Sequence, residues 1–332
     1  MYAFLLLLIL ILTYTVWHYR TLQVSIQPLS QSRSVAARCV LALLIVLHHY
    51  STEMALPPTQ LLYPVGAMAV GVFLFMSGYG LSYSYAHKGE DYLRHFLQKR
   101  FSKIILPFVL AISVWQVEEV YLYGSENLPD RWALMAQGLT RGCLPFSWYV
   151  WVALYYYIAF YLVFRFIRST RLRWVVMLAS WGVQVALVKY GFGWDDYWYY
   201  SSHLFIIGMI YQHAERKLLR VNAYVWMALT LGLAQLVRVD WHFSEIFFNT
   251  AFALLFICGI TRIDVRSKVL DFLGKISYEI YLVQGMSLFA LKDTAFAIGI
   301  KAILMLAVNI ALAYLLHVVV GRVGRKIAFF RQ

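Results

Sequence analysis

The apolar residues of this chain occur in long blocks separated by short polar segments, and they do not recur at the period of an amphipathic helix or strand. A helix needs roughly 20 predominantly apolar residues to cross a bilayer, or fewer when its flanking side chains reach the interface. The pattern therefore predicts an all-α fold, a polytopic transmembrane bundle of about 11 spans. The predicted spans are Tyr2–His18, Ala36–Tyr50, Leu61–Tyr85, Ile104–Tyr123, Trp148–Phe166, Trp174–Tyr190, Trp198–Gln212, Val221–Val237, Ile246–Ile260, Phe272–Leu291 and Ala297–Val320.

The composition excludes a water-soluble class of protein. Hydrophobic residues make up 62% of the 332 residues and charged residues only 14%, so too few polar side chains remain to cover a soluble core. The three cysteines, Cys39, Cys143 and Cys258, do not form the pattern of a disulfide framework. No spacing typical of metal ligands occurs, so no metal is predicted.

The net charge of +13 would suit a nucleic-acid partner if the chain were soluble. Numbering the segments between spans alternately, however, puts 23 of the 29 basic residues on one side and six on the other. Basic residues are retained on the cytoplasmic side of membranes, so the C-terminus is predicted to be cytoplasmic and the N-terminus outside. Residues 1–20 are then an N-terminal transmembrane anchor. The partner that this charge indicates is the lipid bilayer, and no nucleic acid is expected.

Arg38 and His49 occupy the same predicted span, Ala36–Tyr50. The eleven-residue step advances a helix by about 1,100°, so both side chains share a face and lie about 16 Å apart along the axis. An arginine at the inner end with a histidine deeper in the membrane suits an anionic donor and a proton acceptor. The alternative, left open by the pattern, is that Arg38 only records topology and that His48 and His49 cap a short span.

A compact basic patch, formed by Lys99, Arg100 and Lys103, precedes the fourth span. Positive charges this close together suit phosphate groups. The alternative is ordinary contact with lipid headgroups. The span before the patch carries small residues that allow close helix packing or an irregular backbone beside a cavity, with packing the simpler expectation: Gly71, Ser77, Gly78 and Gly80.

Glu279 is the one acidic residue well inside a predicted span, where an unpaired carboxylate is costly. It is expected either to have a functional role or to pair with Lys275, four residues earlier. His203 and His317 have no partner at a recognisable spacing and are expected to make polar contacts between helices.

Glu118 and Glu119 lie near the outer end of the fourth predicted span. If this span packs against the one containing His48 and His49, a carboxylate would orient a histidine and raise its basicity. Both acids are therefore candidate substrate-binding residues.

Four motifs between residues 33 and 284 together resemble those of the acyltransferase-3 family of integral-membrane acyltransferases. Arg38 and His49 match an arginine and a histidine separated by ten residues on an early helix. The other three are a Phe-rich stretch ending in Ser-Gly-Tyr, a basic Arg-x-x-Arg followed by a proline, and Leu-Gly-x-x-Ser-Tyr-x-x-Tyr-Leu near the end. They are resembled here by Phe73–Tyr79, Arg100–Pro107 and Leu273–Leu282.

Three features depart from the family pattern. Lys103 replaces the second arginine of the basic motif, which keeps the charge but loses bidentate geometry. Gln284 stands where many members have a histidine, so no role of that histidine is carried over. The first span is additional to the usual ten-helix core, and residues 33–332 correspond to the acyltransferase-3-like domain.

The resemblance implies a membrane O-acyltransferase in the inner membrane. It would move an acyl group, usually acetyl, from cytoplasmic acyl-CoA to a hydroxyl of a cell-surface carbohydrate or its lipid-linked precursor. Acetyl-CoA is the implied co-substrate. The implied catalytic residues are His49 and Arg38, and the residues expected to bind the donor are Arg38, Lys99, Arg100, Lys103, Ser77 and Tyr79.

Two alternatives stay open at this point. Transfer proceeds either by direct attack of the hydroxyl on the thioester or through an acyl-histidine intermediate. A transporter or exporter of a glycan or small metabolite, without chemistry, is the second functional class, because many spans with short loops also suit transport.

Overall fold

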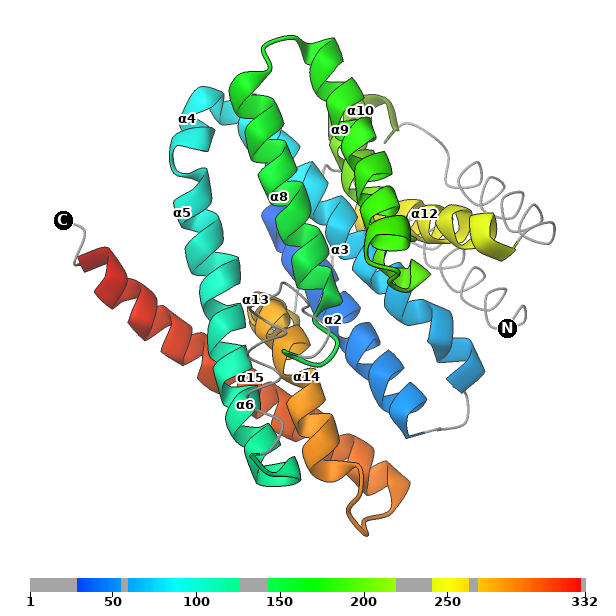
Figure 1. Ribbon diagram of the computed structural model, residues 1–332, viewed down its shortest axis with the longest axis vertical. Helices are drawn as coiled ribbons and strands as arrows, with labels where there is room; N and C mark the ends of the chain where they lie inside the picture. Colours follow the sequence, from blue (N-terminus) through cyan, green and yellow to red (C-terminus); the bar gives the residue numbers. More distant parts are fainter. Residues whose placement is uncertain (1–28, 55–58, 126–142, 219–240, 263–267, 330–332) are drawn as a thin grey trace. The chain divides into compact units, whose positions relative to one another are not determined.

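The computed structural model describes residues 29–54, 59–125, 143–218, 241–262 and 268–329, and every regular element within these ranges is a helix (Figure 1). Within the described ranges, six helices are long and apolar enough to cross a bilayer: Gln31–Glu53, Pro64–Lys88, Phe96–Leu122, Trp148–Phe166, Thr170–Gly191 and Ile298–Lys326. The predicted spans Tyr2–His18 and Val221–Val237 lie outside the described residues. The predicted all-α fold is confirmed, and the chain is a multi-pass membrane protein.

The chain forms two compact units, Met1–Leu93 with Val152–Gly274, and Arg94–Trp151 with Lys275–Gln332. The described helices of the first unit are α2 (Gln31–Glu53), α3 (Thr59–Lys88), α4 (Glu90–Arg94), most of α8 (Trp148–Phe166), α9 (Thr170–Ala186), the turns η3 (Leu187–Gly191) and η4 (Asp196–Trp198), α10 (Leu204–Leu218), α12 (Trp241–Ile260) and α13 (Lys268–Lys275). Those of the second unit are α5 (Phe96–Arg100), the π-turn η1 (Phe101–Ile105), α6 (Leu106–Tyr123), α14 (Ser277–Leu291) and α15 (Ile298–Phe329).

Helix α3 is the centre of the first unit, where it packs against α2, α10 and α12. Glycines let the backbones of α3 and α10 touch. A Cβ added at Gly78 would overlap the carbonyl oxygen of Phe205, and one added at Gly208 would overlap that of Phe75. Small residues permit this approach because no side chain separates the two helices. Close packing is therefore confirmed as the reason for Gly78, whereas Gly80 faces open space.

In the second unit, α14 packs against both α6 and α15. The hydroxyl of Tyr278 donates to the carbonyl oxygen of Ile104 at 3.0 Å, which joins α14 to the π-turn η1 just before α6. On the other side, Glu279 contacts Nδ1 of His317 on α15 at 2.8 Å. His317 is thus a polar contact between helices, as predicted. The structure does not contain the alternative pairing of Glu279 with Lys275, because the helix is interrupted between them at Ile276.

Several predicted boundaries are wrong, and three of them have a clear structural cause. The predicted span Phe272–Leu291 is two helices, since the backbone at Ile276 (φ −99°, ψ 14°) leaves the helical region between α13 and α14. The helix in the predicted span Trp198–Gln212 begins only at Leu204, because side-chain hydrogen bonds hold the preceding segment in turns. The fourth span begins at Phe96, earlier than the predicted Ile104, since α5 and η1 continue directly into α6.

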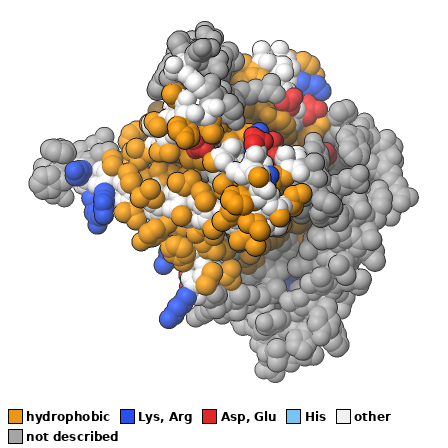
Figure 2. Space-filling view, turned by 90° about the horizontal axis from the view of Figure 1, so that it is seen from below, with side chains coloured by type: hydrophobic (Ala, Val, Ile, Leu, Met, Phe, Trp, Pro, Cys, Tyr) orange, Lys and Arg blue, Asp and Glu red, His pale blue; other side chains and the backbone are white. Residues whose placement is uncertain are grey.

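The outer surfaces of several helices are apolar. Val175 and Leu178 on α9 and Ile303 on α15 are each more than half exposed, at 60%, 52% and 70%. Figure 2 shows hydrophobic side chains over most of the described surface on one face, with charged side chains in a few small groups. Monomeric soluble proteins rarely expose apolar area on this scale, whereas lipid tails cover it without cost.

Candidate functional site

Helix α2 carries Arg38 and His49 without interruption between Gln31 and Glu53. It starts at Ser30, whose Oγ accepts from the backbone N–H of Arg33 at 3.3 Å and caps the first turn. Arg38 is half-buried, and its Nε donates to the carbonyl oxygen of Ser34 at 3.3 Å. Because the helix is continuous, the shared face and the separation of about 16 Å that the spacing predicts both apply to it.

The two adjacent histidines of α2 have different surroundings. The ring of His48 lies against Gly66 of α3, so closely that a Cβ at that glycine would overlap it. His49 is the next residue, and the two rings make an edge contact with centroids 4.7 Å apart. His48 therefore packs between α2 and α3, and the role of His49 in proton transfer stays a prediction.

A buried carboxylate, Glu215 of α10, joins three segments at the other end of the first unit. The hydroxyl of Tyr79 on α3 donates to both of its oxygens, at 2.9 and 3.0 Å. The backbone N–H of Leu29, just before α2, donates to Oε1 at 3.1 Å. Glu215 therefore holds the start of the helix that carries Arg38 and His49.

Glu215 was not predicted from the sequence as a site residue. The available signal was an isolated acid among basic residues at the end of a predicted span, in Gln212-His213-Ala214-Glu215-Arg216-Lys217. Because its neighbours are basic, the segment resembled an ordinary positively charged cytoplasmic loop. The aromatic residue four positions earlier, Tyr211, gives no further indication of the contact with Tyr79.

Replacing Glu215 with alanine is expected to destabilise the protein by about 1–3 kcal/mol, because the buried hydroxyl of Tyr79 and the N–H of Leu29 would lose their acceptor. The free energy is read from thermal unfolding followed with a thiol-reactive dye, since Cys39, Cys143 and Cys258 are all buried. Glu53→Ala, at an exposed carboxylate of the same unit, is the matched control. Equal midpoints for the two variants would contradict the assigned role.

Two predicted donor-site residues of α3 bond to neighbouring helices. Ser77 Oγ accepts from the hydroxyl of Tyr157 on α8 at 3.2 Å, and Tyr79 is bonded to Glu215 as described. Both contacts position α3 inside the first unit. A direct contact of either residue with the donor stays a prediction.

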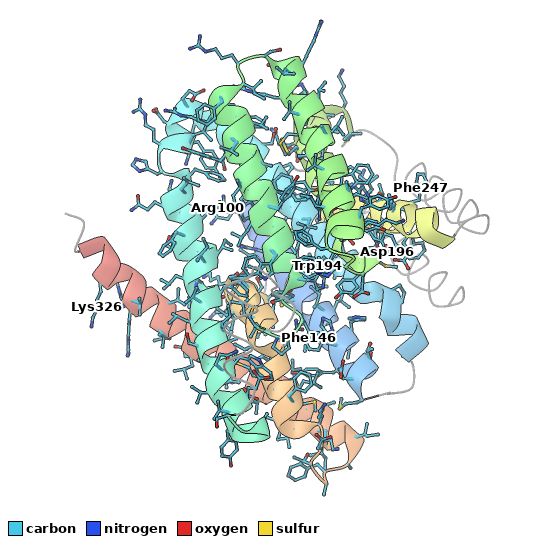
Figure 3. The ribbon with its side chains drawn as sticks, in the orientation of Figure 1. Arg100, Phe146, Trp194, Asp196, Phe247 and Lys326 are labelled. Atoms are coloured by element: carbon cyan, nitrogen blue, oxygen red, sulfur yellow. The ribbon has the colours of Figure 1, made fainter. Side chains whose placement is uncertain are left out.

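The predicted basic patch belongs to the second unit. Lys99 and Arg100 end α5, and Lys103 lies in the π-turn η1, with both lysines exposed. The guanidinium of Arg100, labelled in Figure 3, lies over the ring of Phe96 with 5.2 Å between Cζ and the centroid. A cation on an aromatic face keeps its orientation, while the exposed lysines present mobile charge. The patch is thus part of a continuous helix and not of a loop.

The predicted acids Glu118 and Glu119 lie on α6, also in the second unit. Glu119 is buried, with 5% of its surface exposed, and Glu118 is half-buried. His48 and His49 belong to the first unit, so the orienting contact and the substrate role of the acids stay predictions.

Two buried glutamines of the second unit are further polar groups inside the protein. Gln284 on α14 and Gln116 on α6 are 0% and 6% exposed, and neither side-chain amide has a hydrogen-bond partner among the described residues. An unsatisfied buried amide costs free energy. In the sequence, Gln284 was distinguished only as a departure from the family pattern, and nothing distinguished Gln116.

These features define a class: a multi-pass helical membrane protein with an arginine and a histidine on one face of a spanning helix, and with a separate basic patch. The model of the acyltransferase-3 family, described as an acyltransferase domain, matches residues 36–320, and the chain belongs to this family. The match includes all four motifs, and it confirms the resemblance. Comparisons with curated proteins and with solved structures found no match.

Proposed function

We propose that this membrane acyltransferase moves an acetyl group from cytoplasmic acetyl-CoA to a hydroxyl of a cell-surface carbohydrate or its lipid-linked precursor in the inner membrane. The observation that carries the proposal is the pair Arg38 and His49 on one face of the continuous helix α2, inside a chain of the acyltransferase-3 family. A cation and a base separated along one face suit an extended donor, because the pantetheine arm separates the thioester of acetyl-CoA from its phosphates.

His49 is the general base of the proposed reaction. It takes the proton of the acceptor hydroxyl as the hydroxyl oxygen attacks the thioester carbonyl. The new C–O bond forms and the C–S bond breaks, and the departing CoA thiolate recovers the proton from His49. An acyl-histidine intermediate needs the same residue as nucleophile, so both routes depend on His49.

Phosphate recognition is the proposed role of the positive charges. Arg38 offers a planar guanidinium that pairs with two phosphate oxygens at once, and Arg100 offers a second. Lys99 and Lys103 add exposed charge beside Arg100. Each of these positive charges would favour a donor with phosphate groups over a neutral thioester.

The proposal is tested with the purified chain in lipid nanodiscs, acetyl-CoA labelled in the acetyl group, and envelope glycan from a strain that lacks the protein. The expected result is label on the glycan together with one free CoA thiol per acetyl group transferred. A transporter would instead move solute across proteoliposomes and release no CoA thiol. That outcome would replace the proposed function with transport.

Arg100→Ala is expected to raise the KM for acetyl-CoA by about tenfold, because a charge-assisted hydrogen bond of roughly 1.5 kcal/mol to a phosphate would be lost. The kcat should change little, since the phosphates lie away from the reacting carbonyl. Initial rates at varied acetyl-CoA measure both constants. Lys326→Ala, an exposed basic residue of α15 in the same unit, is the control for a general loss of positive charge. An unchanged KM in Arg100→Ala would remove Arg100 from the donor site.

A further inference from the structure

The first turn of α14 contacts the helix that carries the basic patch. The hydroxyl of Tyr278, the second residue of α14, donates to the carbonyl oxygen of Ile104 at 3.0 Å. Ile104 belongs to the π-turn η1 and directly follows Lys103 in the chain. A side chain of α14 is therefore bonded to the backbone of the turn that contains part of the patch.

The π-turn is a point where the helix from Phe96 to Leu122 is held less regularly by its own backbone. Pro107 has no N–H, so the carbonyl that it would pair with in a regular helix loses this donor. The backbone N–H of Leu106 donates to the carbonyl oxygen of Phe101, in the wider pattern of a π-turn. A hydrogen bond from another helix thus adds restraint where the backbone pattern is irregular.

Two contacts with α15 hold the same turn of α14. Glu279, next to Tyr278, contacts Nδ1 of His317 at 2.8 Å. The side-chain amide of Asn309 donates from Nδ2 to the carbonyl oxygen of Ile280 at 3.3 Å. Because these contacts restrain the turn, the hydroxyl of Tyr278 reaches the π-turn from a fixed position.

Apolar contact joins α6 and α14 farther along, where both helices are labelled in Figure 1. The rings of Trp115 and Phe289 have centroids 5.7 Å apart. Trp115 lies eleven residues after Ile104, and Phe289 lies eleven residues after its α14 counterpart, Tyr278. The two helices therefore run alongside each other for about 16 Å. This packing keeps them together without the bond of Tyr278, whose effect is local to the π-turn.

Arg100 is held on both sides along its helix. Its guanidinium lies over the ring of Phe96, which is buried. Phe96 is four residues before Arg100, and Ile104 is four residues after it, so each is about one helical turn away. A guanidinium with this support presents its N–H groups in a defined direction, which bidentate pairing with phosphate requires.

We propose that Tyr278 is a positioning residue for donor binding, because its bond to Ile104 keeps Arg100 directed at the donor phosphates. The hydroxyl proton of Tyr278 is used by the Ile104 carbonyl, so Tyr278 acts through Arg100. The inference rests on the proposed function, since it takes the basic patch as the site of those phosphates. Without the bond, the helix has the binding arrangement for only part of the time, and the apparent affinity falls by that fraction.

The alternative is a hydrogen bond that contributes to stability alone, and α14 offers a matched control one turn further on. The hydroxyl of Tyr281 also donates to a backbone carbonyl, that of Phe146 in the same unit. Phe146 lies outside the helix that carries the patch. Loss of either hydroxyl should lower the thermal midpoint, whereas only loss of the Tyr278 hydroxyl should weaken donor binding.

Tyr278→Phe removes the hydroxyl and keeps the ring. It is expected to raise the KM for acetyl-CoA about fivefold with kcat unchanged, since a neutral hydrogen bond contributes roughly this factor. Tyr281→Phe should keep the wild-type KM. Initial rates in nanodiscs measure the constants, and the thiol-dye midpoint shows that both variants are folded. A wild-type KM in Tyr278→Phe, an equal rise in both variants, or a fall in kcat would overturn the proposal.

A double variant tests whether Tyr278 acts through Arg100. In protein that already carries Arg100→Ala, Tyr278→Phe should raise the KM by a smaller factor than it does alone, because the side chain to be positioned is gone. If the two factors simply multiply, the residues act independently and the positioning role is wrong.

Binding of tritium-labelled CoA, measured on the same nanodiscs without acceptor, separates this inference from the proposed function. If Tyr278→Phe binds CoA about fivefold more weakly than wild type, and wild type transfers no acetyl group, the positioning role stands and the proposed function fails. If wild type transfers acetyl groups and both proteins bind CoA equally well, the positioning role is overturned and the proposed function stands. Wild-type protein that neither binds CoA nor transfers acetyl groups would overturn both.

Discussion

Replacing His49 with alanine is expected to abolish acetyl transfer while the protein still inserts and folds. The loss should reach about 10²–10⁴-fold or more, the range that general-base catalysis contributes, and a nucleophilic histidine would be lost completely. The measurement is the rate of label transfer from acetyl-CoA to the envelope glycan, with the thiol-dye midpoint as the test of folding.

His48→Ala is the matched control, one residue away on the same helix. Its ring packs on Gly66, so removal leaves a gap between α2 and α3 and should lower the thermal midpoint. Transfer by the folded protein should persist at a reduced rate. If instead His49→Ala keeps full activity and His48→Ala loses it, the proton acceptor is His48 and the assignment is wrong.

Gly78→Ala is expected to disrupt the packing of α3 on α10. The added methyl group would overlap the carbonyl oxygen of Phe205, a backbone atom that moves only if the helices separate. Overpacking of this kind costs about 1–3 kcal/mol, and more where no side chain can yield. The expected result is a large fall in the thermal midpoint and in the yield of folded protein. Gly208→Ala should behave alike, because its Cβ would overlap the carbonyl oxygen of Phe75.

Gly80→Ala is the control, two residues from Gly78 on the same helix. Nothing lies within 4 Å of the position its Cβ would take. Alanine is favoured over glycine inside a helix by roughly 0.5–1 kcal/mol, so this variant should be as stable as wild type or more stable. Similar losses of stability in Gly78→Ala and Gly80→Ala would mean that the contact between α3 and α10 does not determine the fold.

The helices and the shared face of Arg38 and His49 were the predictable parts of this protein. Long apolar blocks have one physical solution in a membrane, so the all-α fold followed from hydropathy alone. The shared face of Arg38 and His49 followed from helical geometry, which depends only on the eleven-residue step. His317 was expected to make a polar contact between helices, and it does so with Glu279.

Contacts between segments distant in the sequence were not predictable. Glu215 binds Tyr79 and the N–H of Leu29, 136 and 186 residues away, and no local pattern records such partners. The predicted start of a span at Trp198 failed for a related reason. Asp196 accepts hydrogen bonds from the hydroxyls of Tyr199 and Tyr200. Side-chain hydrogen bonds of this kind can stabilise a turn where the hydropathy predicts a helix.

The break at Ile276 was missed because hydropathy does not distinguish one long helix from two short ones. The segment contains no proline, and its Gly274 is required for close packing against α2. A Cβ there would overlap the carbonyl oxygen of Val35 on α2. Glycine in this motif thus reflects contact between α13 and α2, which a single sequence does not reveal.

The π-turn Phe101–Ile105 makes the basic patch tolerant of the loss of one residue. A π-turn accommodates one residue more than an α-helical turn, and the helix on either side of it is otherwise continuous. Deleting a single residue here, such as Ser102, would restore α-helical geometry and leave Lys99 and Arg100 in nearly the same orientation relative to α6, because the wide turn had taken up the extra residue. A relative that lacks this residue would therefore present these basic side chains in the same direction.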